Sequence, residues 1–393
     1  MKLAIVAGEA SGDLHAAEVI RELKKLDPGL ETFGIGGDLL AAEGTRVLHH
    51  AREMGIVGVF NVLRHLVMFR RILNEMTHTI ARERPDAVML VDYPDFNLRL
   101  AGRVKAMGLR VIYYISPQVW AWRRGRVRKI ARVVDRMLVI FPFEEDFYRE
   151  HGVPVTYVGH PLIDELMPSP AASRHPLPQA GEGSHAKALA SRSGERVAEG
   201  RVRGLHIALL PGSRRHEVRA LLPPMLDAIS ILKKETEIDA FVIQAPTISS
   251  AELLDVMQRA GEFVRIVPHD RGEALAAADV AMSSSGTATL ECAIAGTPVV
   301  VMYRLSSLTH LLAQRLVKLR HFSLVNIVAG KDVVPELVQR DVNGARIARE
   351  VRTLIEPVQR ALVRAEMATV TEKLGGPGAS RRAAEAIMRT ITS

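Results

Sequence analysis

Hydroxyl and glycine residues cluster in one short segment of the second half of the chain, between an apolar run and a helical stretch. Residues 283–289 are Ser-Ser-Ser-Gly-Thr-Ala-Thr, and Glu291 follows one helical turn later. Backbone N–H groups and hydroxyls in such a loop can surround a phosphate at a helix N-terminus, where the helix dipole favours an anion. We therefore expect Ser284, Ser285, Gly286 and Thr287 to bind phosphate and Glu291 to bind a ribose. An ordinary helix N-cap is the alternative interpretation.

A second junction of an apolar run, a glycine loop and a helix lies at Leu209–Val218, where the loop is Pro-Gly-Ser-Arg-Arg. Gly212 and Ser213 can present backbone N–H groups, and the guanidinium of Arg214 has the geometry to bind a diphosphate. An exposed arginine pair at a helix start is the alternative. The Ser284–Glu291 segment in the same half of the chain favours the diphosphate.

A third such junction opens the chain, where the apolar run Leu3–Ala7 leads into Gly-Glu-Ala-Ser-Gly-Asp. Open α/β sheets bind ligands in the crevice beyond the carboxyl ends of their strands. We therefore assign Ser11 and Gly12 to substrate binding. The glycine spacing is not that of the dinucleotide-binding fingerprint.

Two carboxylates follow the apolar run that ends at Val91, in the segment Asp-Tyr-Pro-Asp-Phe-Asn. Asp95 is placed to act as a general base that deprotonates a sugar hydroxyl, and Asp92 to position that hydroxyl. Capping of the helix that follows Pro94 is the alternative role for Asp95.

Metal chemistry is not expected, because the histidines and the single cysteine lack the spacing of metal ligands. The residues considered were His15, His49, His50, His160, His216, His269 and Cys292. Neither a Walker loop nor a nucleophile elbow occurs. The sequence therefore predicts no metal and no other cofactor.

The elements that must position these residues alternate between strand and helix. Strands are expected at residues 2–7, 32–35, 87–91, 110–115, 136–139, 155–158, 206–210, 240–244, 264–266, 280–282 and 298–302. Alternation of this kind predicts doubly wound parallel sheets, here two Rossmann-like α/β domains facing a cleft. We expect the domains at 1–167 and 205–365, a disordered insertion at 168–204, and C-terminal helices at 366–393 packing back on the first domain.

The net charge of +8 and the pI near 9.7 indicate anionic partners. The tryptophan- and arginine-rich segment 120–132 suggested RNA, but no nucleic-acid-binding motif accompanies it, so a phosphate or a membrane surface is preferred. Residues 54–76 are largely apolar with flanking arginines, which fits either a buried helix or an interfacial helix on anionic lipid. The expected lipid contacts are Val59, Phe60, Leu63, Val67, Phe69, Arg70 and Arg71.

The single cysteine fits a reducing compartment. No secretory signal is recognisable, since Met1-Lys2 leads directly into a strand. No segment reaches the roughly 18–20 apolar residues of a membrane span.

Taken together, the motifs resemble those of the lipid-A-disaccharide synthase family of glycosyltransferases, which have the two-domain GT-B fold. The resemblance rests on seven motifs in order: Gly8-Glu-Ala-Ser-Gly-Asp13, Pro94-Asp-Phe-Asn97, Ser116-Pro-Gln-Val-Trp-Ala-Trp122, Val158-Gly-His-Pro-Leu162, Leu210-Pro-Gly-Ser-Arg214, Ser285-Gly-Thr-Ala-Thr-Leu-Glu291 and Ser323-Leu-Val-Asn326.

The resemblance implies transfer of a sugar from UDP-2,3-diacylglucosamine to 2,3-diacylglucosamine 1-phosphate (lipid X), with inversion, to give a β-1,6 disaccharide and UDP. It implies that Asp95 and Asn326 are required for catalysis and that Arg214 binds the diphosphate. Residue 325 is Val where the family has proline, and the 168–204 insertion is longer than the family's linker.

Because both substrates carry acyl chains, the resemblance also implies a cytoplasmic enzyme associated peripherally with the inner face of the inner membrane. Another UDP-GlcNAc-type GT-B transferase and a UDP-sugar 2-epimerase are the enzymatic alternatives. A basic membrane- or RNA-binding protein is the non-enzymatic one. A homodimer is left open.

Overall fold

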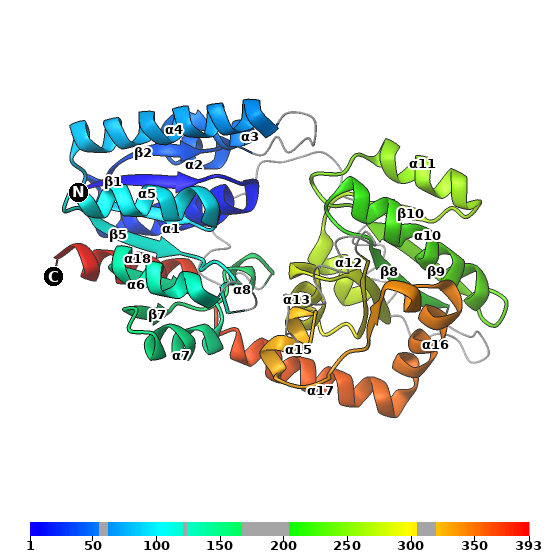
Figure 1. Cartoon of the computed structure of the whole chain (residues 1–393). Helices are drawn as coiled ribbons and strands as arrows, with labels where there is room; N and C mark the ends of the chain where they lie inside the picture. The colour runs from blue at the N-terminus through cyan, green and yellow to red at the C-terminus, as the bar shows by residue number, and fades with distance from the viewer. Residues whose placement is uncertain (55–61, 121–123, 167–203, 305–319, 393) are drawn as a thin grey trace. The chain divides into compact units, whose positions relative to one another are not determined.

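The computed structural model describes residues 1–54, 62–120, 124–166, 204–304 and 320–392, with the backbone alone at 62–66 and 124. Two compact units result: unit 1 comprises Met1–Ser169 and Leu374–Ser393, and unit 2 comprises Pro170–Lys373 (Figure 1). Val59, Phe60, the side chain of Leu63 and nearly all of the 168–204 insertion lie outside the described residues.

Unit 1 contains a seven-stranded parallel sheet in the order β3-β2-β1-β4-β5-β6-β7. The strands are β1 (Lys2–Ala7), β2 (Glu31–Gly36), β3 (Arg46–His50), β4 (Ala87–Val91), β5 (Arg110–Tyr114), β6 (Arg136–Val139) and β7 (Val155–Tyr157). The order reverses between β1 and β4, and this is the point where open α/β sheets bind ligands.

Helices cover both faces of this sheet, because its central strands are apolar on both sides. One face packs on α4 (Val62–Glu83), α5 (Pro94–Ala106), α6 (Val127–Val133) and α7 (Pro142–Glu150). The other face packs on α1 (Ala10–Leu26) and α18 (Ala379–Thr392), which lie against each other. The shorter helices are α2 (Asp38–Ala42), α3 (Ala51–Met54) and α8 (Leu162–Leu166).

Unit 2 contains a six-stranded parallel sheet in the order β10-β9-β8-β11-β12-β13. The strands are β8 (Leu205–Leu210), β9 (Ile238–Ile243), β10 (Arg265–Val267), β11 (Val280–Ser284), β12 (Val299–Tyr303) and β13 (Glu336–Val338). The helices are α10 (Arg215–Leu232), α11 (Ser250–Ala260), α12 (Arg271–Ala277), α13 (Thr287–Ile294), α15 (Leu324–Ala329), α16 (Gly344–Ile355) and α17 (Pro357–Lys373). The order reverses between β8 and β11, so this sheet is also doubly wound.

The sequence missed two strands, β3 and β13, and both lie at an edge of their sheet. β3 is Arg-Val-Leu-His-His and is at most half-buried, while β13 has three residues. An edge strand is covered less than a central one, so it lacks the continuous apolar run that marks the others.

No helix in the described parts of the chain combines the length and the apolar character that crossing a membrane requires.

Candidate functional site

Two of the expected phosphate loops lie side by side in unit 2. β8 and β11 are neighbouring parallel strands, with Leu210 opposite Ser283. The segment that begins at Pro211 and the segment that begins at Ser285 therefore leave the same edge of the sheet at its switch point. Each leads directly into a helix, α10 and α13 respectively, so two helix N-termini meet at this edge.

The first loop presents Arg214 to solvent. Its side chain is 71% exposed and contacts Glu217, which lies one turn into α10, at 3.1 Å. Glu217 Oε2 also accepts hydrogen bonds from the backbone N–H groups of Ser213 (3.1 Å) and Arg214 (3.2 Å). Gly212 has φ +116°, and a Cβ there would lie 2.5 Å from the Glu217 carboxylate. An internal carboxylate thus occupies donors that we assigned to a diphosphate.

The second loop needs glycine for its backbone, because Gly286 has φ +136°. Ser284 is buried at the end of β11, and the hydroxyl of Ser285 donates to the carbonyl of Phe322 at 2.7 Å. Thr287 is exposed at the first position of α13. Thr287 and the helix N-terminus are therefore the accessible donors of this loop.

Glu291 lies one turn into α13 and is 9% exposed. One terminal nitrogen of Arg271 donates to both of its carboxylate oxygens, at 2.8 and 3.1 Å. Because a carboxylate offers about four acceptor positions, this pair fixes Glu291 and leaves acceptor capacity for hydroxyl groups.

Asn326 is fully buried, and its amide is saturated by protein groups. Its Nδ2 donates to the carbonyl of Val334 (2.9 Å) and to Glu336 Oε1 (2.8 Å). Its Oδ1 accepts from the N–H groups of Val333 (2.8 Å) and Val334 (3.0 Å). In this conformation every polar atom of the Asn326 side-chain amide is paired within the protein, and the amide holds residues 333–336 in place.

Glu336 extends the Asn326 network to the second phosphate loop. It accepts hydrogen bonds from the N–H groups of Phe322 and Ser323, both at 2.8 Å. Phe322 in turn receives the hydroxyl of Ser285 and stacks on Tyr303, with ring centroids 5.8 Å apart. Asn326 and Glu336 thereby hold residues 322–323 against the Ser285 loop.

In unit 1 the segments that follow β1 and β4 also lie side by side, since Ala7 is opposite Val91. A Cβ on Gly8 would lie 2.7 Å from the ring of Tyr93. Asp92 and Tyr93 both have φ +45°, a conformation that costs non-glycine residues energy. Asn97 Nδ2 and the Tyr113 hydroxyl both donate to the carbonyl of Asp92, at 2.7 and 2.5 Å, and so stabilise this turn.

The strained turn delivers Asp95 to the first turn of α5, where its side chain is 68% exposed. Arg126 donates to Asp95 Oδ1 at 2.8 Å. Asp92 lies deeper, and burial together with the charge of Glu9 raises its pKa to about 6. Asp95 is therefore the accessible carboxylate of this turn.

Ser11 is exposed in the first turn of α1, whereas Gly12 is buried against the sheet, where an added Cβ would lie 3.6 Å from side-chain atoms of Ala7 and Val91. Gly12 thus lies at the contact between α1 and the sheet. The neighbouring Asp13 is buried and accepts N–H groups of Gly37, Leu39 and Leu40, which caps α2.

The segment after β5 is held by a buried carboxylate. Glu144 is 1% exposed and accepts hydrogen bonds from the Ser116 hydroxyl (2.5 Å) and from Trp120 Nε1 (3.0 Å). Burial raises the pKa of Glu144 to about 7, against these hydrogen bonds, which favour its ionised form. Ile115, a β-branched residue, has φ +60° at the start of the segment. Trp120 therefore packs inside unit 1.

The residues expected to contact lipid divide between the two sides of α4. Val67 is 68% exposed, Arg70 is exposed, and Arg71 is exposed and paired with Glu75 at 2.7 Å. Phe69 instead faces the core, 5.0 Å from the ring of Phe96. Its role in lipid contact is not supported by this packing.

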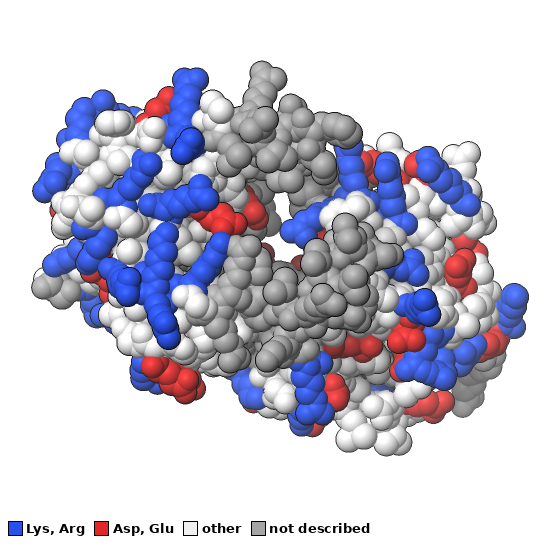
Figure 2. All heavy atoms as spheres, in the orientation of Figure 1, with Lys and Arg blue, Asp and Glu red and all other residues white. Residues whose placement is uncertain are grey.

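Figure 2 shows Lys and Arg side chains gathered on the face of unit 1 over α5 and α6. The exposed members of this basic patch are Arg99, Arg103, Arg128, Lys129 and Arg132.

His15, Glu18 and Glu165 form a group whose ligand atoms lie within 4.8 Å of one another. Burial lowers the pKa of His15 to about 4 and raises that of Glu18 to about 7. Glu18 also accepts the hydroxyl of Ser380 at 3.2 Å, which connects α1 to α18. These three side chains thus serve helix packing in unit 1.

Four functional carboxylates and cations are not predicted by the sequence motifs: Glu217, Arg271, Glu336 and Glu144. Glu217 and Glu144 carry a usable signal, because an acidic residue at the third helical position often caps a helix. Arg271 and Glu336 carry none, since each meets its partner only when separate elements pack together, Arg271 from α12 on α13 and Glu336 from β13 on α15.

Solved structures with this arrangement of two sheets define the class of protein. A UDP-GlcNAc 2-epimerase from Neisseria meningitidis superposes with a TM-score of 0.66 at 14% identity, covering 99% of this chain and 100% of that one. MurG from Acinetobacter baumannii gives a TM-score of 0.55 at 15% identity, covering 99% of each chain. The fold is therefore the GT-B fold of glycosyltransferases and UDP-sugar epimerases.

Sequence comparison narrows this class to one family. The lipid-A-disaccharide synthase of Myxococcus xanthus (strain DK1622) is 41% identical over 392 residues, which cover 99% of this chain and 97% of that protein. The enzyme of the same name from Anaeromyxobacter dehalogenans (strain 2CP-1) is 43% identical over 392 residues, covering 98% and 97%. Residues 3–390 match the lipid-A-disaccharide synthetase family, and the chain belongs to it.

Proposed function

We propose that the chain transfers diacylglucosamine from UDP-2,3-diacylglucosamine to 2,3-diacylglucosamine 1-phosphate, forming a β-1,6 disaccharide and releasing UDP. The observation that carries the proposal is the pair of adjoining glycine loops in unit 2, with Arg214 exposed on one and Thr287 on the other. The family to which the chain belongs supports a UDP-sugar as the donor.

On the donor side, the diphosphate binds the two helix N-termini, and the guanidinium of Arg214 donates hydrogen bonds to the diphosphate oxygens. Charge develops on the leaving β-phosphate in the transition state, so preorganised N–H groups and a guanidinium stabilise it there. Glu291, fixed by Arg271, accepts the ribose hydroxyls and orients the donor. The two loops are shaped by Ser213, Ser284, Ser285 and Gly286. In unit 1, Ser11 supplies a polar group for substrate binding.

On the acceptor side, Asp95 removes the proton of the 6-hydroxyl while that oxygen attacks the anomeric carbon. The bond from that carbon to the β-phosphate oxygen breaks on the opposite face, which inverts the configuration and releases UDP. Arg126 orients the Asp95 carboxylate. Asp95 belongs to unit 1 and the glycine loops belong to unit 2.

Acylated substrates place the reaction at a membrane surface, and unit 1 offers two candidate contacts. Val67 and Arg70 project from α4, and the basic patch over α5 and α6 suits anionic headgroups. We propose peripheral binding at the inner face of the inner membrane through these groups.

The deciding experiment incubates the purified chain with both substrates in the presence of EDTA and detects products by mass spectrometry. A tetraacyl disaccharide phosphate together with UDP is the expected result. UDP binding without that product would transfer the assignment to another UDP-sugar transferase or to a 2-epimerase. Failure to bind UDP would contradict the nucleotide site itself.

Paired variants then test the residue roles. Asp95→Asn should lower kcat by about 10²–10⁴-fold, the usual contribution of a general base, with little change in UDP binding. Asp146→Asn, at an exposed carboxylate on α7, is the matched control. Arg214→Ala should weaken UDP binding, whereas Arg215→Ala, next to it and paired with Glu252, should not.

A further inference from the structure

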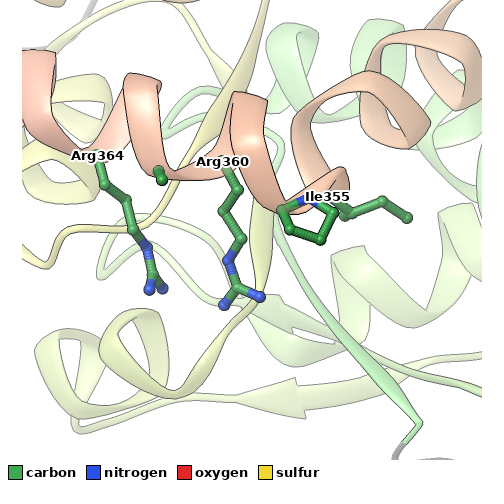
Figure 3. A pocket seen from close by; sticks show the side chains of 5 residues that line it. Ile355, Arg360 and Arg364 are labelled. Atoms are coloured by element: carbon green, nitrogen blue, oxygen red, sulfur yellow. The ribbon is translucent and has the colours of Figure 1, made fainter.

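A cavity of about 380 Å³ opens on unit 2 beside α17. It is lined by Ile355, Pro357, Arg360, Ala361 and Arg364. Figure 3 shows Arg360 and Arg364, one helical turn apart, extending side by side from α17. Arg360 reaches Asp279, which immediately precedes β11. The cavity therefore lies at the amino-terminal edge of the sheet, opposite the edge that carries the glycine loops.

Of the two guanidinium groups, only that of Arg360 is paired with a carboxylate in the part of the chain that the structure describes. Arg360 donates to Asp279 Oδ1 at 2.9 Å, and Asp279 Oδ2 accepts the N–H of His206 at 3.0 Å. Arg360 Nε is buried without a hydrogen-bond partner, and Arg364 makes no ion pair or hydrogen bond within the described ranges. Burial and the charge of Arg360 lower the pKa of Arg364. An anion between the two arginines would remove this imbalance.

An apolar stripe adjoins the arginines on α17. Val358 is 76% exposed and Leu362, four residues on and hence on the same face, is 58% exposed. The other exposed members of the stripe are Pro357, Ala361 and Ala365. Between Pro357 and Ala365 the helix has no acidic residue, and Glu366, which borders the stripe, is paired with Lys331 at 2.7 Å. A cationic edge beside an exposed apolar face is the pattern of a helix that lies in a lipid interface.

We propose that α17 docks on an anionic lipid surface, with a headgroup phosphate between Arg360 and Arg364 and with Val358 and Leu362 among the acyl chains. Charge favours this occupant over a second copy of the chain, whose net charge is +8. The docking surface does not depend on the proposed reaction, because it lies at the other edge of the unit 2 sheet from the nucleotide loops.

A fluorophore on α17 reports docking at this surface directly. In the full chain carrying Val358→Cys, only the new thiol is accessible to a polarity-sensitive label, because Cys292 is fully buried. Vesicles of equimolar phosphatidylglycerol and phosphatidylcholine should shift the emission to the blue, and brominated acyl chains should quench it. Arg364→Gln should raise the lipid concentration for half the shift about fivefold. Arg340→Gln, an exposed arginine elsewhere on unit 2, should leave it unchanged.

Four outcomes would overturn the proposal. If these vesicles leave the spectrum unchanged, α17 is not a docking surface. If Arg364→Gln and Arg340→Gln weaken vesicle binding equally, the attraction is due to diffuse charge. A shift that grows with protein concentration without lipid identifies a second copy. If inorganic phosphate stabilises wild type but not Arg364→Gln, and vesicles give no spectral shift, free phosphate is the ligand. UDP binding of Arg364→Gln should equal that of wild type, so the nucleotide site is judged separately.

Discussion

One nitrogen of Arg271 lies 2.8 and 3.1 Å from the two carboxylate oxygens of Glu291 and so connects the start of α12 to α13. Glu291 is 9% exposed, and burial of a carboxylate costs desolvation energy that a charged partner offsets. Arg271 supplies that partner from one side. The remaining acceptor positions of Glu291 are those that we assign to the ribose.

This arrangement predicts discrimination against 2′-deoxyribose. Wild type should bind UDP roughly tenfold more tightly than dUDP, because a hydrogen bond to a charged group contributes about 1.5–3 kcal/mol. Glu291→Gln should reduce that ratio to within about threefold. Isothermal titration with both nucleotides measures it, and Glu273→Gln on α12 is the control. If the ratio of UDP to dUDP affinity were unchanged in Glu291→Gln, the assignment of ribose binding to Glu291 would be wrong.

Replacing Glu217 should instead strengthen UDP binding. It accepts the N–H groups of Ser213 and Arg214, so a bound diphosphate must compete with its negative charge. Glu217→Gln keeps a carbonyl acceptor for the loop and removes the charge, and UDP affinity should rise about threefold to tenfold.

The same titration series distinguishes the alternative role of Glu217. If the carboxylate serves chiefly to hold Arg214 toward the ligand, Glu217→Gln would weaken UDP binding. Glu252→Gln, another carboxylate that caps a helix in unit 2, controls for loss of a cap.

The strand–loop–helix junctions could be predicted from sequence because their signals are local. An apolar run followed by glycine and hydroxyl residues defines the segments around Gly8, Gly212 and Gly286 without any tertiary information. Asp95 was found for the same reason, since Pro94 marks the start of its helix.

The groups that complete these loops could not be predicted in the same way. Glu144 lies 28 residues from Ser116, and Arg271 lies 20 residues from Glu291, so only the packing of separate elements in the folded units brings them together. Asn326 shows another limit: its motif indicates a role in catalysis, but only the structure shows that its buried amide is committed to Val333, Val334 and Glu336.

Asn326→Ala should therefore act first on stability. Removing the amide leaves buried N–H and C=O groups without partners, and the free energy of unfolding should fall by about 3 kcal/mol. Denaturant unfolding measures this, with Gln258→Ala on the surface of α11 as the control. Unchanged stability together with a large loss of kcat would instead support a direct role of Asn326 in catalysis.

Glu18 makes the stability of unit 1 depend on pH. Burial raises its pKa from 4.5 to about 7, so the folded state binds the proton more tightly than the unfolded chain does. The stabilisation is complete below pH 4.5 and is lost as the pH rises through about 7. Relative to Glu18→Gln, which stays neutral and retains an acceptor for Ser380, wild type should lose on the order of 2 kcal/mol over this interval. Urea unfolding at a series of pH values measures the difference, and Glu31→Gln, at an exposed carboxylate on β2, should show no comparable trend. A difference between wild type and Glu18→Gln that stays constant with pH would mean that the pKa of Glu18 is the same in the folded and unfolded states.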